Sequence, residues 1–294
     1  MFLPSEKTGM VLGTLCALMV LALAGPALAQ GISVAPSRIV LDGKTRAATV
    51  FLSNRSDEAE TYRISMAYFV MTDDGTLVRA DSTTTGVVNF ADEVLRYSPR
   101  RVVIPAGGSQ TVRLLVRRPR DRNVDDQEFR AHLSVCSVPT VPRLKEVEEN
   151  LPELTSDDQF IVRAVASVET LVPIIVRFGH PEADMAVSGL GVRPGDDGGP
   201  PEVTFRIDRT GSRSLYGNLT VTHVDPMGNE TQLFFGRGVA VYTPNASRRF
   251  TVTSPVPNLD LFSGRIAVDY VETADGGGDL RTHVELDSSQ LSRR

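Results

Sequence analysis

The feature that most constrains the fold is an alternation of apolar and polar residues with a period of two. It runs through Tyr62, Ile64, Met66, Tyr68 and Val70 and returns at Val112, Leu114 and Val116. Successive side chains of a β-strand point to opposite faces, so this period indicates strands with one face buried.

Short turn motifs separate the alternating segments. They are Asp42-Gly43, Asp73-Asp74-Gly75, Pro105-Ala106-Gly107-Gly108, Pro226-Met227-Gly228-Asn229 and Asp275-Gly276-Gly277-Gly278. Many short strands with turns at such intervals are typical of antiparallel sandwiches. We therefore expect an all-β protein.

The first residues have the layout of an export signal. Lys7 precedes an apolar segment from Met10 to Ala24, and Ala27-Leu28-Ala29 suits cleavage by signal peptidase. Cleavage after Ala29 leaves 294 − 29 = 265 residues, enough for one large or two ordinary domains. No later apolar run has the length of a membrane span, so we expect no membrane insertion.

Two changes in composition divide the rest of the chain. Residues 139–158 carry charges and prolines and predict a mobile loop. After Phe178-Gly179-His180-Pro181-Glu182 the strand patterns start again. We place one domain at residues 30–179, a second at 182–286 and a flexible tail at 287–294.

Signals of catalysis or metal binding are absent from the sequence. His132, His180, His223 and His283 are scattered, without partners at metal-ligand spacing. No nucleophile elbow or phosphate-binding glycine loop occurs, so we expect neither an enzyme nor a cofactor. The formal charge of −5 comes from intermixed residues and gives no support to a nucleic-acid partner or an anionic membrane surface, so we expect no nucleic-acid partner. Cys136, the one cysteine left after cleavage, is interpreted as a buried, inert thiol.

Arg38 places a charge inside a strand-like apolar run, Ser33 to Gly43. Leu52-Ser53-Asn54, then Tyr97-Ser98-Pro99-Arg100-Arg101 through Pro105, and then Ser109 to Leu114 follow it in order. Together these segments resemble the PapD-like periplasmic chaperones of pilus assembly. The resemblance implies two immunoglobulin-like β-sandwich domains in an L-shaped arrangement.

The resemblance also implies a function. Such chaperones bind pilin-like secreted subunits by donating a strand, and pass them to an outer-membrane usher. Here the donor strand corresponds to Phe160 to Val176. Its donating face carries Phe160, Val162, Ala164, Ala166 and Val168. From the pattern alone, the same segment also fits an ordinary core strand.

In this family an arginine on the first strand and a lysine on the donor strand bind the terminal carboxylate of the subunit. Arg38 matches the arginine, although a solvated arginine at a sheet edge fits the sequence equally well. Pro173 stands at the lysine position and supplies no cation. Arg177, four residues further on, is the candidate substitute.

A third feature implied by the resemblance is an ionic contact between the two domains. Arg113 and Glu128 correspond to its first-domain members, with Glu272 or Asp275 as the second-domain acid. We expect these residues to be structural. The alternative to a chaperone is an exported structural or adhesive protein that keeps both sandwiches without donating a strand; an exported enzyme ranks third.

Overall fold

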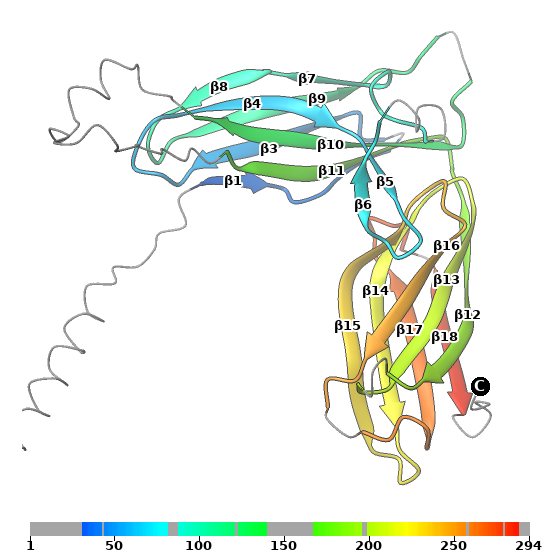
Figure 1. The fold of residues 1–294 in the computed structure, drawn as a ribbon. Coiled ribbons are helices and arrows are strands. Elements are labelled where there is room, and N and C mark those ends of the chain that lie inside the picture. Colours follow the sequence, from blue (N-terminus) through cyan, green and yellow to red (C-terminus); the bar gives the residue numbers. More distant parts are fainter. Residues whose placement is uncertain are drawn as a thin grey trace, which may run out of the picture.

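The computed structural model describes residues 31–42, 44–81, 88–120, 123–139, 167–195, 199–256, 259–278 and 280–287. Over these ranges the regular secondary structure is all strand, and no helix long and apolar enough to cross a membrane occurs among them. Two elongated β-sandwiches meet end to end at an angle and form an L (Figure 1). The predicted fold class is thus confirmed.

The first sandwich packs a four-stranded sheet, in the order β1-β3-β9-β7, against a five-stranded sheet, in the order β2-β11-β10-β4-β8. Its strands are β1 (Ile32–Ala35), β2 (Ile39–Leu41), β3 (Ala47–Asn54), β4 (Glu60–Ala67), β7 (Leu95–Ser98), β8 (Arg101–Ile104), β9 (Ser109–Val116), β10 (Gln127–Val138) and β11 (Glu169–Phe178). All pairings are antiparallel except that of β2 with β11.

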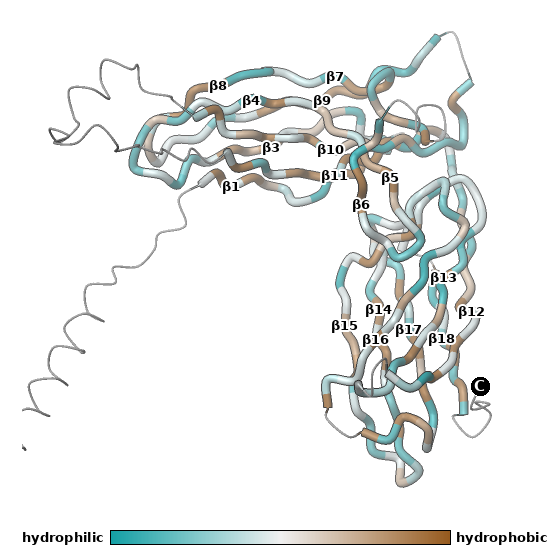
Figure 2. Tube along the Cα trace, viewed as in Figure 1, coloured by the Kyte–Doolittle hydropathy of each residue, from teal (hydrophilic) through white to brown (hydrophobic). Residues whose placement is uncertain are grey.

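Alternate residues of these strands build one core between the two sheets, as the period of two predicts. Val50, Leu52, Val112 and Leu114 face inward from one sheet, and Phe129 does so from the other. The alternation is visible as changing hydropathy along the strands in Figure 2. Burial of this apolar surface is the main favourable term in the stability of the domain.

Asn54 shows why the Leu52-Ser53-Asn54 segment and the turn at Pro105 go together. Its side chain is fully buried, and its Nδ2 donates to the carbonyl oxygens of Glu58 at 2.7 Å and Ile104 at 3.1 Å. Its Oδ1 accepts the backbone N–H of Ser56 at 3.0 Å. A buried amide costs stability unless its groups are paired, so these bonds tie the end of β3 to the turn after β8.

The second sandwich packs a sheet in the order β12-β13-β16 against one in the order β15-β14-β17-β18. Its strands are β12 (Ala183–Arg193), β13 (Glu202–Gly211), β14 (Leu215–Val224), β15 (Glu230–Val241), β16 (Ser247–Thr253), β17 (Arg265–Glu272) and β18 (Arg281–Asp287). Phe205, Phe250 and Tyr270 lie in its core. The change from one sandwich to the other falls between Phe178 and Ala183.

The long alternation from Tyr62 to Val70 is split between two elements. β4 ends at Ala67, and β5 (Phe69–Met71) then pairs with β6 (Leu77–Arg79) in a separate hairpin. In Figure 1 this hairpin extends from the first sandwich toward the second. A change of sheet without a change of period leaves little trace in the sequence.

Several expectations concern residues outside the described ranges. They include the export signal at 1–29, the loop at 139–158 beyond Pro139, and residues 288–294 of the tail. Asp287, assigned to the tail, is instead the last residue of β18 and pairs with Arg265.

Candidate functional site: the cleft between the domains and the edge of β11

A small apolar cluster joins the two domains at the corner of the L. Met71 of β5 and Ile175 of β11 pack there with Ala240 and Tyr242 from the end of β15. Val40 and Tyr216 cover the cluster at its margin. The outer face of β11 near its end is therefore buried by the second domain rather than exposed to solvent.

Glu128 is the polar centre of this junction. It lies opposite Arg177 in the β10–β11 ladder, and Arg177 Nε donates to its Oε2 at 3.0 Å. Its other oxygen accepts hydrogen bonds from Ser214 of the second domain, one from the backbone N–H at 3.1 Å and one from the hydroxyl. The carboxylate is almost fully buried, so these hydrogen bonds compensate for the hydration that it has lost.

Arg213, beside Ser214, forms a second buried ion pair inside the second domain. Its Nη2 lies 3.1 Å from Glu272 Oε2, and its Nη1 donates to the carbonyl oxygen of Gly276 at 2.9 Å. Arg213 and Glu272 are both largely buried. Two acid–arginine pairs, one in each domain, thus lie on either side of the contact that Ser214 makes.

Arg38 follows β1 and reaches across the junction. Its guanidinium stacks on the ring of Tyr216, 3.7 Å from the centroid, and its Nη1 donates to the Tyr242 hydroxyl at 3.0 Å. Asp275 approaches its Nε to 4.0 Å. The side chain is only 7% exposed, and its Nε and Nη2 have no hydrogen-bond partner within the described chain.

Arg130 and His132 lie near Arg38 on the outer face of β10. Arg130 stacks on the Tyr242 ring at 4.5 Å and donates to the carbonyl oxygen of Thr243 at 2.6 Å. His132, two residues along, packs edge-on against Phe69. Burial lowers the pKa of Arg130, and burial together with the nearby arginines lowers the pKa of His132 to about 4. The junction is therefore rich in positive charge and strongly desolvated.

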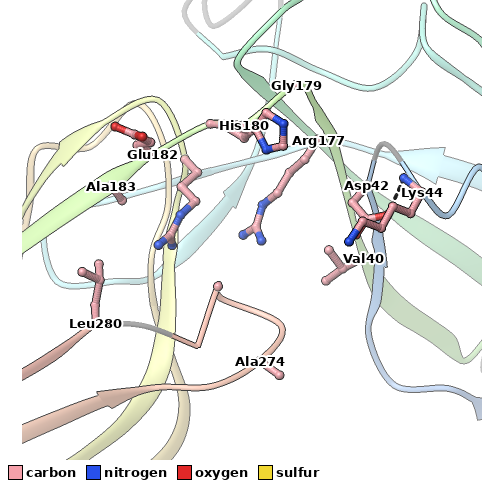
Figure 3. Close-up of a pocket in the computed structure, with 13 residues that line it drawn as sticks. Val40, Asp42, Lys44, Arg177, Gly179, His180, Glu182, Ala183, Ala274 and Leu280 are labelled. Atoms are coloured by element: carbon pink, nitrogen blue, oxygen red, sulfur yellow. Dashed lines mark hydrogen bonds between the residues drawn. The ribbon is translucent and has the colours of Figure 1, made fainter.

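A cleft of about 820 Å³ opens beside this junction, between the end of β11 and the second domain. Figure 3 shows the Arg177 side chain extending into it between Val40 on one side and Ala183 and Leu280 on the other. Lys44 and Arg213 also line the cleft, together with the acids Asp42 and Glu182. Positive and negative side chains thus line the cleft together.

β11 has an unequal environment along its two edges. One edge pairs with β10 over the whole strand, whereas β2 covers the other edge only from Ile174 to Val176. Within the described residues, Glu169 to Pro173 therefore have no ladder partner on that side. Val168 and Leu171 beside this edge are 52% and 37% exposed.

The predicted site residues other than Arg113 and Val168 fall into three groups. Arg38, Arg177, Glu128 and Asp275 meet at the junction, where Arg177 pairs with Glu128. Glu272 lies inside the second domain with Arg213. Phe160, Val162, Ala164 and Ala166 fall outside the described residues.

Arg113 is the residue that the structure places elsewhere. It lies exposed on β9, opposite Thr49, in the sheet that does not contain Glu128. Arg177 takes the position beside Glu128 because it is the direct cross-strand neighbour. Sequence spacing alone does not reveal whether β9, which carries Arg113, or β11, which carries Arg177, lies next to β10.

Arg130, Ser214, Tyr216 and Tyr242 are junction residues that the sequence analysis missed. The sequence does contain a pattern that points to Arg130, because Glu128, Arg130 and His132 alternate with the core residues of β10. Polar residues at alternate positions of an otherwise buried strand indicate a second covered face. Ser214 and the two tyrosines carry no comparable pattern.

No group of three or more His, Cys, Asp and Glu side chains that could hold a metal ion occurs in the described ranges. Cys136, expected to be buried, is half-buried, and its Sγ lies 3.6 Å from the carbonyl oxygen of Ser137.

No family model and no curated protein matches the sequence. Solved structures that overlap with the chain include the class 5 fimbriae chaperone CfaA, at 13% identity and a TM-score of 0.45, covering 89% of this chain and 100% of that one. The Pseudomonas aeruginosa CupB2 chaperone overlaps at 11% identity and 0.44, with coverages of 87% and 100%. The Salmonella enterica complex of the SafA pilin with the SafB chaperone gives 17% and 0.40, with coverages of 87% and 97%.

Each of these three structures is a chaperone or contains one. At such identities and TM-scores the overlap concerns the fold alone. The function must therefore be inferred from the residues of this chain.

Proposed function

We propose that this protein is a periplasmic chaperone that binds pilin-like secreted subunits by adding a strand to them, and delivers them to an outer-membrane usher. The observation that carries the proposal is the open edge of β11 at Glu169 to Pro173. The export signal expected at residues 1–29 supports the compartment.

An open strand edge presents unpaired N–H and C=O groups, and these groups pair readily with an extended strand of another chain. The partner best suited to this edge is a sandwich that lacks one of its own strands. Val168 lies beside the edge with half of its surface exposed, so it is available to such a partner. The predicted donating residues Phe160 to Ala166 precede it directly in the chain.

The junction and the cleft beside it give the subunit's terminal carboxylate a place to bind. Arg177 lines the cleft, and Arg38 lies in the junction next to it. Arg38 is the proposed primary anchor, because two of its guanidinium nitrogens have no partner in the described structure. Arg177 is the proposed second cation; its Nε is used by Glu128, whereas its Nη2 has no partner among the described residues. A guanidinium keeps its charge when it is desolvated, which favours it for this task.

The test is to express tagged mature protein in its own periplasm and to identify what copurifies. We expect a small secreted subunit with the wild type, and its loss with Arg38→Ala and with Val168→Asp, which puts a charge beside an apolar groove. Val103→Asp is the matched control, because Val103 is 61% exposed on β8, a different strand of the same sheet.

Retention of the subunit by Val168→Asp would show that another surface binds it. Recovery of the protein outside the cell without any subunit would favour the structural or adhesive alternative.

A further inference from the structure

The guanidinium of Arg38 is held in a specific orientation at the junction. Its plane is fixed by stacking on Tyr216, and one corner is fixed by the hydrogen bond from Nη1 to the Tyr242 hydroxyl. The two remaining nitrogens, Nε and Nη2, form the edge that binds both oxygens of a carboxylate side by side. Both are buried and lack a hydrogen-bond partner within the described residues.

A carboxylate of the same chain already stands at this edge. Asp275 Oδ2 lies 4.0 Å from Arg38 Nε, which is within ion-pair range but too long for a hydrogen bond. Its side chain is 54% exposed, in contrast to the buried acids Glu128 and Glu272. Asp275 belongs to the glycine-rich turn between β17 and β18.

We propose that Asp275 is an intramolecular competitor for the carboxylate site that the proposed function assigns to the Nε–Nη2 edge of Arg38. The inference rests on the proposed function, because it assigns the subunit's terminal carboxylate to this edge. Asp275 and an incoming carboxylate carry the same charge and need the same two donors. The subunit must therefore displace Asp275, so Asp275 weakens capture and eases release.

A competing role and a structural role of Asp275 predict opposite changes in carboxylate binding when its charge is removed. If Asp275 served mainly to join the domains, its removal would disturb Arg38 and weaken carboxylate binding. If it competes, its neutralisation frees the Arg38 edge. Because Asp275 is more than half exposed, its charge is screened as in water, where a unit charge 4 Å away changes binding by about fivefold.

The experiment uses mature protein with ¹⁵N-labelled arginine, and sodium acetate as the probe at low ionic strength. The Arg38 Nε–H resonance, identified by its loss in Arg38→Lys, reports binding at this edge. Acetamide serves as the uncharged control. We expect Asp275→Asn to lower the half-saturating acetate concentration by about fivefold relative to the wild type.

Asp260→Asn is the matched control. It removes the same charge from an exposed position before β17, at the end of that strand away from Glu272 and the junction. It should leave the acetate titration unchanged.

Unchanged or weaker acetate binding in Asp275→Asn would refute the role of Asp275 as a competitor. The absence of any acetate response at Arg38, in both proteins, would overturn the carboxylate site itself. Stronger acetate binding in Asp275→Asn together with failure to copurify any subunit would refute the proposed function and leave the site standing.

Discussion

Glu128→Gln removes one charge of the buried ion pair that Glu128 forms with Arg177 at the junction of the domains. It keeps the size of the side chain and one acceptor oxygen but removes the charge. Arg177 is then left without its counter-charge, with a side chain only 10% exposed. Ser214 loses a charge-assisted acceptor for its backbone N–H and its hydroxyl.

The magnitude follows from burial. Removing one member of a buried ion pair costs about 3 to 5 kcal/mol, because the remaining charge stays desolvated. The amide oxygen of the glutamine still accepts one hydrogen bond, so we expect a loss near the lower end, about 3 kcal/mol. The two domains should also unfold less cooperatively, because Glu128 bonds to both of them.

The assay is urea unfolding followed by far-ultraviolet circular dichroism, since the chain contains no tryptophan. Glu285→Gln is the control: Glu285 lies 3.4 Å from Arg265, and both side chains are about half exposed. Breaking such a surface pair costs less than about 1 kcal/mol. A loss for Glu128→Gln no larger than that of the control would refute the reasoning.

Two further predictions concern the same junction. Because the pKa of His132 is lowered to about 4 from its usual 6.5, the unfolded chain binds more protons between those values, and stability falls as the pH drops through that window. In urea unfolding, the free energy of unfolding of the wild type should fall between pH 7 and pH 4.5 by about 2 kcal/mol more than that of His132→Asn. An equal pH dependence in both proteins would contradict this. Gly75 has a φ of 90°, and an added Cβ would overlap the guanidinium end of Arg248 and push this second-domain side chain away from the hairpin. Gly75→Ala should therefore loosen the β5–β6 hairpin and broaden the angle distribution seen by small-angle X-ray scattering, whereas Gly107→Ala, with φ of 63° and no neighbour within 4 Å, should not.

The class of fold was accessible from the sequence because the period of two is a local property. Each strand needs only its own residues to define a buried face, and Val50, Leu52, Val112 and Leu114 lie in the core as that period requires. The change from one sandwich to the other falls between Phe178 and Ala183, and the strand patterns of the sequence start again after Glu182. The hairpin of β5 and β6 could not be predicted from the sequence, because the alternation continues through Tyr68 although β4 ends at Ala67 and β5 pairs with β6 instead.

The site was accessible only in part. A charged residue in an apolar strand pointed to Arg38, and the structure places it at the junction of the domains. Which acid faces which arginine depends on strand order and register, which bring Arg177 beside Glu128 and leave Arg113 exposed.

The sequence by itself determined that the described chain is built from strands with one buried face, because backbone geometry couples that face to a period of two. Only the tertiary structure decided that Arg38 stacks on Tyr216, bonds to Tyr242 and meets Asp275, since these partners stand about two hundred residues away along the chain. Such contacts arise from the docking of two separately patterned domains. No local pattern encodes which side chains meet across that interface.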